Sequence, residues 1–172
     1  MKKNEGLSLV ELIVVIAVAA VMVSVVGISI TVVSRQKVSN AASEVRALFQ
    51  TAQTIAMSKD NCHVDIQRTS NGETVFTIYS SSNTILDKVT VSEKISVSIG
   101  AKGSETAVSG HGIVRYYYKR ESGSFSKSLE GCTATTDGSE TSSFFNSIVF
   151  SNGSGSKSVS IQLTKLTGKV SY

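Results

Sequence analysis

An almost uninterrupted apolar stretch from Gly6 to Val33 limits how this chain of 172 residues can fold. About 20 apolar residues in a helix are enough to cross a bilayer. Glu11 interrupts the stretch close to its start. A carboxylate inside a membrane helix costs roughly 2.5–3.5 kcal/mol on insertion scales, so its position needs a physical reason.

Two ordinary interpretations of this stretch are incomplete. A secretory signal peptide has an apolar region of about 7–15 residues and then a cleavage site of small residues. This stretch is longer, and no Ala-x-Ala-like site follows it. A simple membrane anchor fits the length but leaves Glu11 unexplained.

The short basic leader that ends in Gly6 and the segment G-L-S-L-V-E-L-I-V-V-I-A resemble the N-terminus of type IV prepilins and type II secretion pseudopilins. In that family a peptidase cuts after the glycine, and the new N-terminal residue is methylated. The resemblance implies cleavage between Gly6 and Leu7 and N-methylation of Leu7. Glu11 then becomes the fifth residue of the mature chain, where the family has a glutamate.

The resemblance also implies a role for Glu11 in assembly. An isolated ammonium or carboxylate is costly in an apolar core. If the amino group of Leu7 in one subunit meets Glu11 of its neighbour, each charge offsets the cost of the other. Such a pair would fix the register between helices, as one buried polar group does in a coiled coil.

Apolar residues continue beyond Ser34 at steps of three and four, which predicts an amphipathic helix. They are Val38, Ala41, Ala42, Val45, Leu48, Phe49, Ala52, Ile55 and Ala56. The chain has no proline, so we expect one helix from Leu7 to about Ser58. Many type IV pilins have a proline in the apolar half; here Gly27 is the expected soft point.

After a helix exit at Lys59-Asp60-Asn61 the apolar period changes to two, which predicts strands. The expected strands are Val64–Ile66, Thr74–Tyr79, Ile85–Val91, Ile95–Ile99, Ile113–Arg120, Ser147–Phe150, Ser158–Thr164 and Lys169–Tyr172. Asn71-Gly72 is a hairpin signal. Gly100–Gly112 and Glu121–Ser143 are expected to be loops. The C-terminal run from Ile148 to Val170 resembles the end of GspH/FimT-like minor pilins and pseudopilins.

The sequence therefore predicts an α+β fold in three parts. They are a leader peptide at residues 1–6, a long helix at 7–59 and a β-rich globular domain with an antiparallel sheet at 60–172. Within the helix, residues 7–33 are expected in a membrane or filament core. Lys2 and Lys3 would stay cytoplasmic, which places the domain on the extracytoplasmic side.

Cys62 and Cys132 both follow the apolar stretch. Disulfides persist outside the cytoplasm, so a bond between them is one interpretation and two free thiols the other. The bond would close a loop of roughly 70 residues and add about 4 kcal/mol on the chain-entropy model. Two cysteines without C-x-x-C spacing do not indicate a zinc site.

No catalytic constellation, cofactor site or metal site is evident. His63 follows Cys62, but adjacent strand residues point to opposite faces, so we interpret His63 as a surface or edge residue. His111, between two glycines, is expected in a loop. Tyr116, Tyr117 and Tyr118 lie among Arg115, Lys119 and Arg120, a pattern that either contacts nucleic acid or alternates between core and surface.

The function expected from the resemblance is that of a non-enzymatic structural subunit of a type IV pilus or related filament, and within that class we expect a minor pilin. Alternatives are a competence or type II secretion pseudopilin, a major pilin, and a pilus-borne adhesion or DNA-binding module. The implied partners are other pilin subunits, the prepilin peptidase, the pilus assembly platform and the membrane. The subunit would span the cytoplasmic membrane once before it enters a surface filament.

Overall fold

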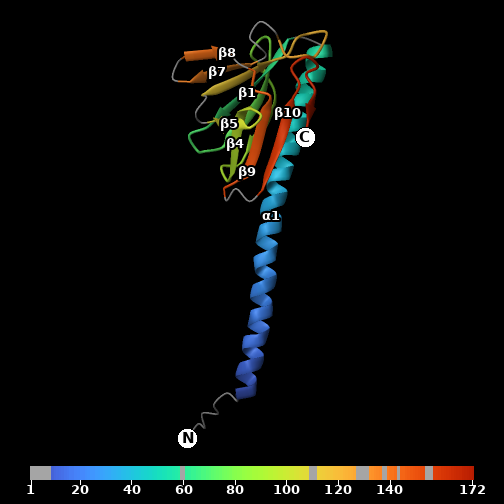
Figure 1. Ribbon diagram of the computed structural model, residues 1–172. Coiled ribbons are helices and arrows are strands. Elements are labelled where there is room, and N and C mark those ends of the chain that lie inside the picture. Colours follow the sequence, from blue (N-terminus) through green and yellow to red (C-terminus); the bar gives the residue numbers. More distant parts are fainter. Residues whose placement is uncertain are drawn as a thin grey trace. The chain divides into compact units, whose positions relative to one another are not determined.

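The computed structural model describes residues 9–58, 61–108, 112–126, 132–136, 139–142, 144–153 and 157–172, with the backbone alone for 23–34 and 132–142. The chain divides into two compact units, one ending at Gln36 and the other comprising Lys37–Tyr172. The fold is α+β, with one long helix and antiparallel strands in the described residues (Figure 1).

The helix α1 runs from Leu9 to Ser58 without a break, as the absence of proline allows. Gly27 lies inside it and does not end it. Glu11 is in its first turn, where a carboxylate interacts favourably with the positive end of the helix dipole. The expected exit residues Lys59 and Asp60 lie outside the described residues.

Within the described residues, no helix has the combination of length and apolar character that crossing a membrane requires.

Two antiparallel sheets form the rest of the second unit. The first has the order β3-β2-β1-β6-β7-β8, and the second has the order β11-β10-β9-β4-β5. The first sheet comprises β1 (Cys62–Arg68), β2 (Thr74–Ser80), β3 (Ile85–Val91), β6 (Ile113–Tyr117), β7 (Cys132–Thr136) and β8 (Ser139–Ser142). The second comprises β4 (Ile95–Ala101), β5 (Ser104–Ala107), β9 (Ser147–Asn152), β10 (Ser158–Leu163) and β11 (Val170–Ser171).

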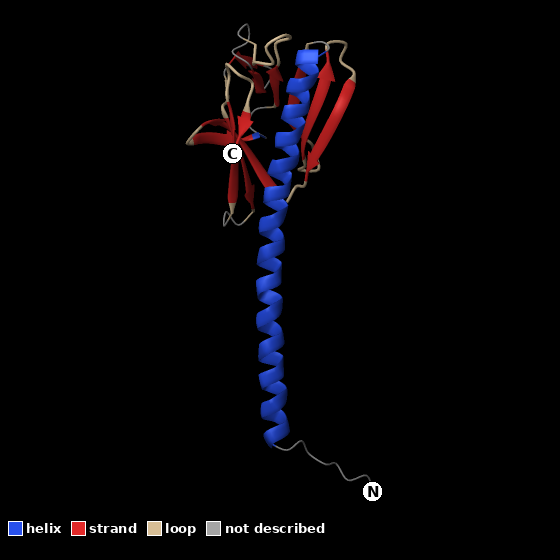
Figure 2. Cartoon of the chain, turned by 90° about the vertical axis from the view of Figure 1, so that its right-hand side faces the viewer, coloured by secondary structure: helices blue, strands red, loops and turns tan. Residues whose placement is uncertain are grey.

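The core of the second unit lies where α1 meets both sheets, and strands flank this part of the helix (Figure 2). The predicted helical stripe is buried, with Ile55 only partly so; its fully covered members are Val38, Ala42, Val45, Phe49, Ala52 and Ala56. Phe49 packs edge-on against Tyr116 of β6, with ring centroids 5.5 Å apart. At the end of the second sheet, the hydroxyl of Tyr172 and the hydroxyl of Ser43 on α1 form a hydrogen bond of 2.7 Å, in which either can be the donor.

Eight strands form where apolar alternation predicts them, but the two expected loops were wrong. Gly100–Gly112 contains β5, which pairs with β4 through a tight turn at Gly103 (φ +88°). Glu121–Ser143 contains β7 and β8 as well as the buried Phe125. The residues of β5, β7 and β8 are mostly Ser, Thr, Ala and Glu, so backbone pairing with a neighbour, and not an apolar face, decides their conformation.

Two glycines allow three distant segments to meet beside the end of α1. A Cβ on Gly168 would collide with the carbonyl oxygen of Gly123, so no residue with a side chain fits at position 168. Both glycines have positive φ. Gln53 of α1 joins the segments, because its side-chain Nε2 donates to the carbonyls of Gly123 at 3.3 Å and Thr167 at 2.8 Å.

Candidate functional site

The first half of α1 exposes apolar side chains on every side. Glu11 lies among them, while Gly6 and Leu7 lie outside the described residues. Leu9, Val10, Leu12, Ile13, Val14, Val15, Ile16, Val18, Val21 and Met22 are all between 52% and 75% exposed. A helix that is apolar all round needs cover from lipid or from other protein.

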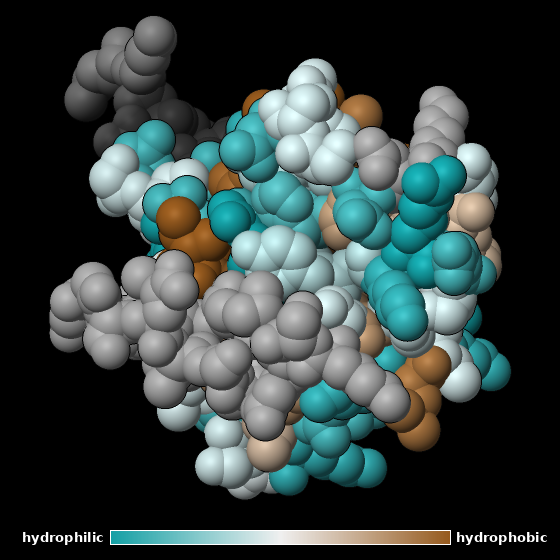
Figure 3. Space-filling model, turned by 90° about the horizontal axis from the view of Figure 1, so that it is seen from above, coloured by the Kyte–Doolittle hydropathy of each residue, from teal (hydrophilic) through white to brown (hydrophobic). Residues whose placement is uncertain are grey.

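The surface of the second unit has a different character. Seen from the end at which α1 stops, the described surface is mostly hydrophilic or near neutral, and its apolar patches are small and separate (Figure 3). Scattered apolar residues of this kind are normal on a protein that faces water. In the described part of the second unit, the exposed large apolar residues are few: Met57, Ile85, Leu86, Leu166 and Tyr172. Among the residues with described side chains, the long exposed apolar surface is therefore that of Leu9–Met22.

A second candidate site lies on the outer face of the first sheet, where three neighbouring strands form a grid. In one row Asp65 of β1 lies opposite Thr77 of β2 and Arg115 of β6. In the next row His63 lies opposite Tyr79 and Tyr117. The imidazole stacks on the Tyr79 ring at 5.3 Å and lies 5.5 Å from the Tyr117 ring, so three rings cross the three strands.

Arg115 and Asp65 form a bidentate ion pair in this grid. The guanidinium donates from Nε and Nη2 to the two carboxylate oxygens of Asp65, each at 2.6 Å. These hydrogen bonds, together with a weaker one from Nη1 to the Tyr117 hydroxyl at 3.4 Å, raise the pKa of Arg115. A paired guanidinium with this geometry is held in place and has little capacity left for another anion.

His63 is buried, with 7% of its surface exposed, so the expectation of a surface or edge histidine was wrong. The reason is topological, because β1 is an inner strand and Tyr79 and Tyr117 cover the ring from both sides. Burial lowers the pKa of His63, with a further lowering from Arg115 and an opposing effect from Asp65. Its Nε2 has no hydrogen-bond partner and lies 3.8 Å from Oδ1 of Asp65.

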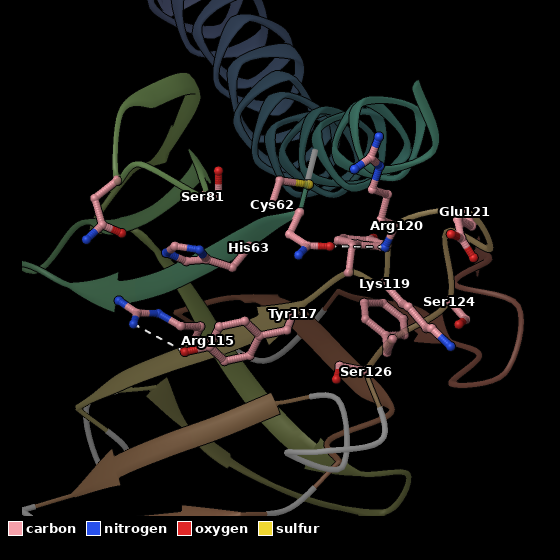
Figure 4. A pocket seen from close by; sticks show the side chains of 14 residues that line it. Cys62, His63, Ser81, Arg115, Tyr117, Lys119, Arg120, Glu121, Ser124 and Ser126 are labelled. Atoms are coloured by element: carbon pink, nitrogen blue, oxygen red, sulfur yellow. Dashed lines mark hydrogen bonds between the residues drawn. The ribbon is translucent and has the colours of Figure 1, made fainter. Parts of the chain in front are cut away.

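Cys62 points to α1 and His63 to the opposite face, as alternation predicts (Figure 4). The Cys62 Sγ–H donates to the carbonyl of Ala52 at 3.1 Å. The side chain of Cys132 lies outside the described residues. Its backbone pairs with Tyr116, and β6 separates β7 from β1. Two strand spacings amount to about 9.5 Å, more than the usual Cα separation of a disulfide. The Cys62–Cys132 bond stays a prediction, and it would require this register to change.

The three consecutive tyrosines alternate between core and surface, which confirms the structural interpretation of that pattern. Tyr116 and Tyr118 are buried, and Tyr117 is half-buried on the outer face. The Tyr118 hydroxyl donates to the carbonyl of Phe49 at 3.1 Å, and burial raises its pKa. Lys119 and Arg120 are exposed.

Two cavities border the ion pair and the row of rings, and a third, of about 420 Å³, lies beside the turn between β1 and β2. The first two are considered together. The larger, of about 900 Å³, is bordered by the start of β1, the end of β6 and the loop that follows it. The smaller, of about 350 Å³, lies over the middle of β2, β1 and β6. The described residues contain no cluster of three potential metal ligands. His111 lies outside them.

Sequence reasoning missed the pairing of Asp65 with Arg115 and the ring row around His63. The residues of the ion pair are 50 positions apart, and only the register of β1 on β6 brings them together. Alternation indicated which residues share a face but not which strands are neighbours.

Residues 1–27 match the family model of the prokaryotic N-terminal methylation motif. No curated protein and no solved structure matches the chain significantly.

Proposed function

Because the first 27 residues carry the N-terminal methylation motif, which supports membership of the type IV pilin and pseudopilin class, we propose that the chain is a structural subunit of a type IV pilus or related filament. The observation that carries this proposal is the combination of that motif with a helix that is apolar on all sides around Glu11. Such a surface needs cover from lipid or from other protein.

In the proposed cycle the prepilin peptidase cuts between Gly6 and Leu7, and Leu7 is N-methylated. The apolar half of the helix waits in the cytoplasmic membrane with the second unit on the extracytoplasmic side. The assembly platform then moves the subunit into the filament. There the apolar surface of Leu9–Met22 is covered by neighbouring helices, and Glu11 pairs with the amino group of an adjacent Leu7.

Within the class we propose a minor subunit of the GspH/FimT-like kind. The support is the C-terminal run that resembles that group, which here forms the meander β9–β10–β11. A major pilin, or a pseudopilin of a type II secretion or competence system, would share the N-terminal half. Stoichiometry in sheared filaments distinguishes these, because a minor subunit is present at a small fraction of the major one.

The first test is the N-terminal residue and mass of the protein isolated from its native host. We expect N-methyl-Leu7 in cells with the prepilin peptidase and an intact Met1 in cells without it. Cleavage after Val33, or an unprocessed chain in both strains, would contradict the proposal.

Glu11 offers a second test with a matched control on the same helix. Glu11→Gln should abolish or strongly reduce recovery of the subunit in sheared filaments, because the amino group of Leu7 loses its counter-charge in an apolar core. Glu44→Gln, at an exposed position of α1, should leave recovery unchanged. Equal recovery of both variants would remove Glu11 from the assembly model.

A further inference from the structure

The two cavities on the outer face of the first sheet adjoin one another. They share three lining residues, His63, Asn83 and Arg115. A continuous depression therefore runs from the loop after β6 to the middle of the sheet, and we name the two cavities together the outer groove. Its larger part alone, about 900 Å³, is within the size range of protein sites for small molecules.

The floor of the outer groove is built from side chains that hold one another in place. Arg115 and Asp65 are locked by two hydrogen bonds of 2.6 Å. The rings of Tyr79, His63 and Tyr117 form a row across three strands. Groups fixed in advance lose little conformational entropy when a ligand binds, which favours affinity.

His63 adds an independent indication that something binds there. Its imidazole is more than nine-tenths buried, yet Nε2 has no hydrogen-bond partner. Buried polar atoms in native proteins nearly always have one, so the exception needs an explanation. His63 lines both cavities, so the residue that carries this unsatisfied nitrogen borders each of them.

The charges of the groove argue against a polyanion. The Arg115 guanidinium is already bonded to Asp65, whose carboxylate would repel a phosphate in the floor. Lys119 and Arg120 on the rim are exposed, and Glu121 beside them offsets one of these charges. The expectation that the basic residues contact nucleic acid therefore has weak support from the geometry.

The same groups suit a ligand with many neutral hydroxyls. Sugar hydroxyls both donate and accept, and the groove offers an acceptor in Asp65, a donor in Arg115 and an amide of both kinds in Asn83. Half-buried Tyr117 presents an aromatic ring with a polar tip, against which the apolar face of a sugar ring can lie. We infer that the outer groove binds an oligosaccharide of neutral sugar rings.

Asn83 provides a clean variant for the test. It has φ +59° in the turn between β2 and β3, a conformation that glycine adopts without strain. Asn83→Gly therefore removes the amide and keeps the turn. Asn71→Gly makes the same chemical change in the exposed turn between β1 and β2, outside both cavities, and serves as the matched control. Tyr117→Phe removes the hydroxyl at the tip of the ring row.

The experiment is isothermal titration calorimetry of the full chain in detergent micelles. The probes are the linear pentasaccharides of β-1,4-linked N-acetylglucosamine and of α-1,4-linked glucose, with a single-stranded oligonucleotide for comparison. We expect one pentasaccharide to bind with a Kd of about 1 mM or tighter. Asn83→Gly and Tyr117→Phe should each weaken it by about fivefold or more, and Asn71→Gly should not.

Three results would overturn the inference. They are no heat of binding with either pentasaccharide, saccharide binding that Asn83→Gly leaves intact, and binding of the oligonucleotide alone with a steep salt dependence. A thermal scan of each variant confirms that it is folded. If Tyr117→Phe unfolds, Asn83→Gly and its control decide the question. The inference does not depend on the proposed filament role, so each can fail separately.

Discussion

The two halves of α1 belong to one helix but differ in how their apolar side chains are covered. From Leu9 to Met22 every side is apolar and exposed, whereas from Val38 to Ala56 the apolar residues form one stripe that the sheets cover. The second half obtains its cover within the chain, and the first half must obtain it from lipid or from other subunits. The same backbone therefore serves folding at one end and association at the other.

The largest expected difference between the halves comes from removing a large side chain in each. Phe49→Ala should destabilise the second unit by about 3–5 kcal/mol, because Phe49 is fully buried against Tyr116. Ile13→Ala, at a position 57% exposed, should not change the unfolding free energy of that unit. Guanidinium titration of the full chain in micelles, followed by near-UV circular dichroism, measures both. Equal losses would abolish the contrast.

A smaller effect is expected when side chains are enlarged. Ala42 is fully buried, so Ala42→Leu should cost about 1–3 kcal/mol through overpacking. Ala20 is exposed, and Ala20→Leu should leave the second unit unaffected. The same titration compares them, and a stable Ala42→Leu protein would mean that the stripe is loosely packed.

The contact between Tyr118 and the carbonyl of Phe49 tests a single hydrogen bond to the covered half of α1. Tyr118→Phe should cost about 0.5–1.5 kcal/mol, since it removes one buried hydroxyl and leaves the ring in place. Tyr172→Phe removes the exposed hydroxyl that bonds Ser43 and should cost less. A larger loss for Tyr172→Phe would show that the C-terminal contact governs how the helix is held.

The smallest expected effect on stability concerns β1, whose two faces also differ in character. Its inner face is apolar, and its outer face buries His63 beside Asp65 and Arg115. Because the pKa of folded His63 lies below 6.5, the unfolded chain takes up the proton first as the pH falls. The free energy of unfolding should therefore be highest above pH 6.5, and it should decrease as the pH falls from 6.5 to the lowered pKa of folded His63.

Thermal melts between pH 7.5 and 5 check this sign. His63→Gln should reduce the decline, whereas His111→Gln should preserve it. A steeper decline in His63→Gln would show that Asp65 outweighs burial and that the pKa is raised instead.

The helix and its apolar stripe were predictable because the helical period of 3.6 is a local pattern in the sequence. Val38, Ala42 and Val45, spaced by four and three residues, show it without any information on distant contacts. Eight strands followed from alternation for the same reason. β5, β7 and β8 were not predictable, because Ser- and Thr-rich segments become strands only when a partner strand lies beside them. The outer groove was hidden for a related reason, since Asp65, Thr77 and Arg115 meet only through register.

The junction of Gln53 with Gly123 and Thr167 has a consequence for the timing of synthesis. Gln53 can form its two hydrogen bonds only after Gly123 and Thr167, which lie 70 and 114 residues later in the chain, have been synthesised. At about 5–20 residues per second, the interval to Thr167 is roughly 6–23 s. The stripe of α1 is made long before the last strands can cover it. A chaperone or the membrane surface therefore has several seconds in which to shield it, and interrupted translation would leave it bare.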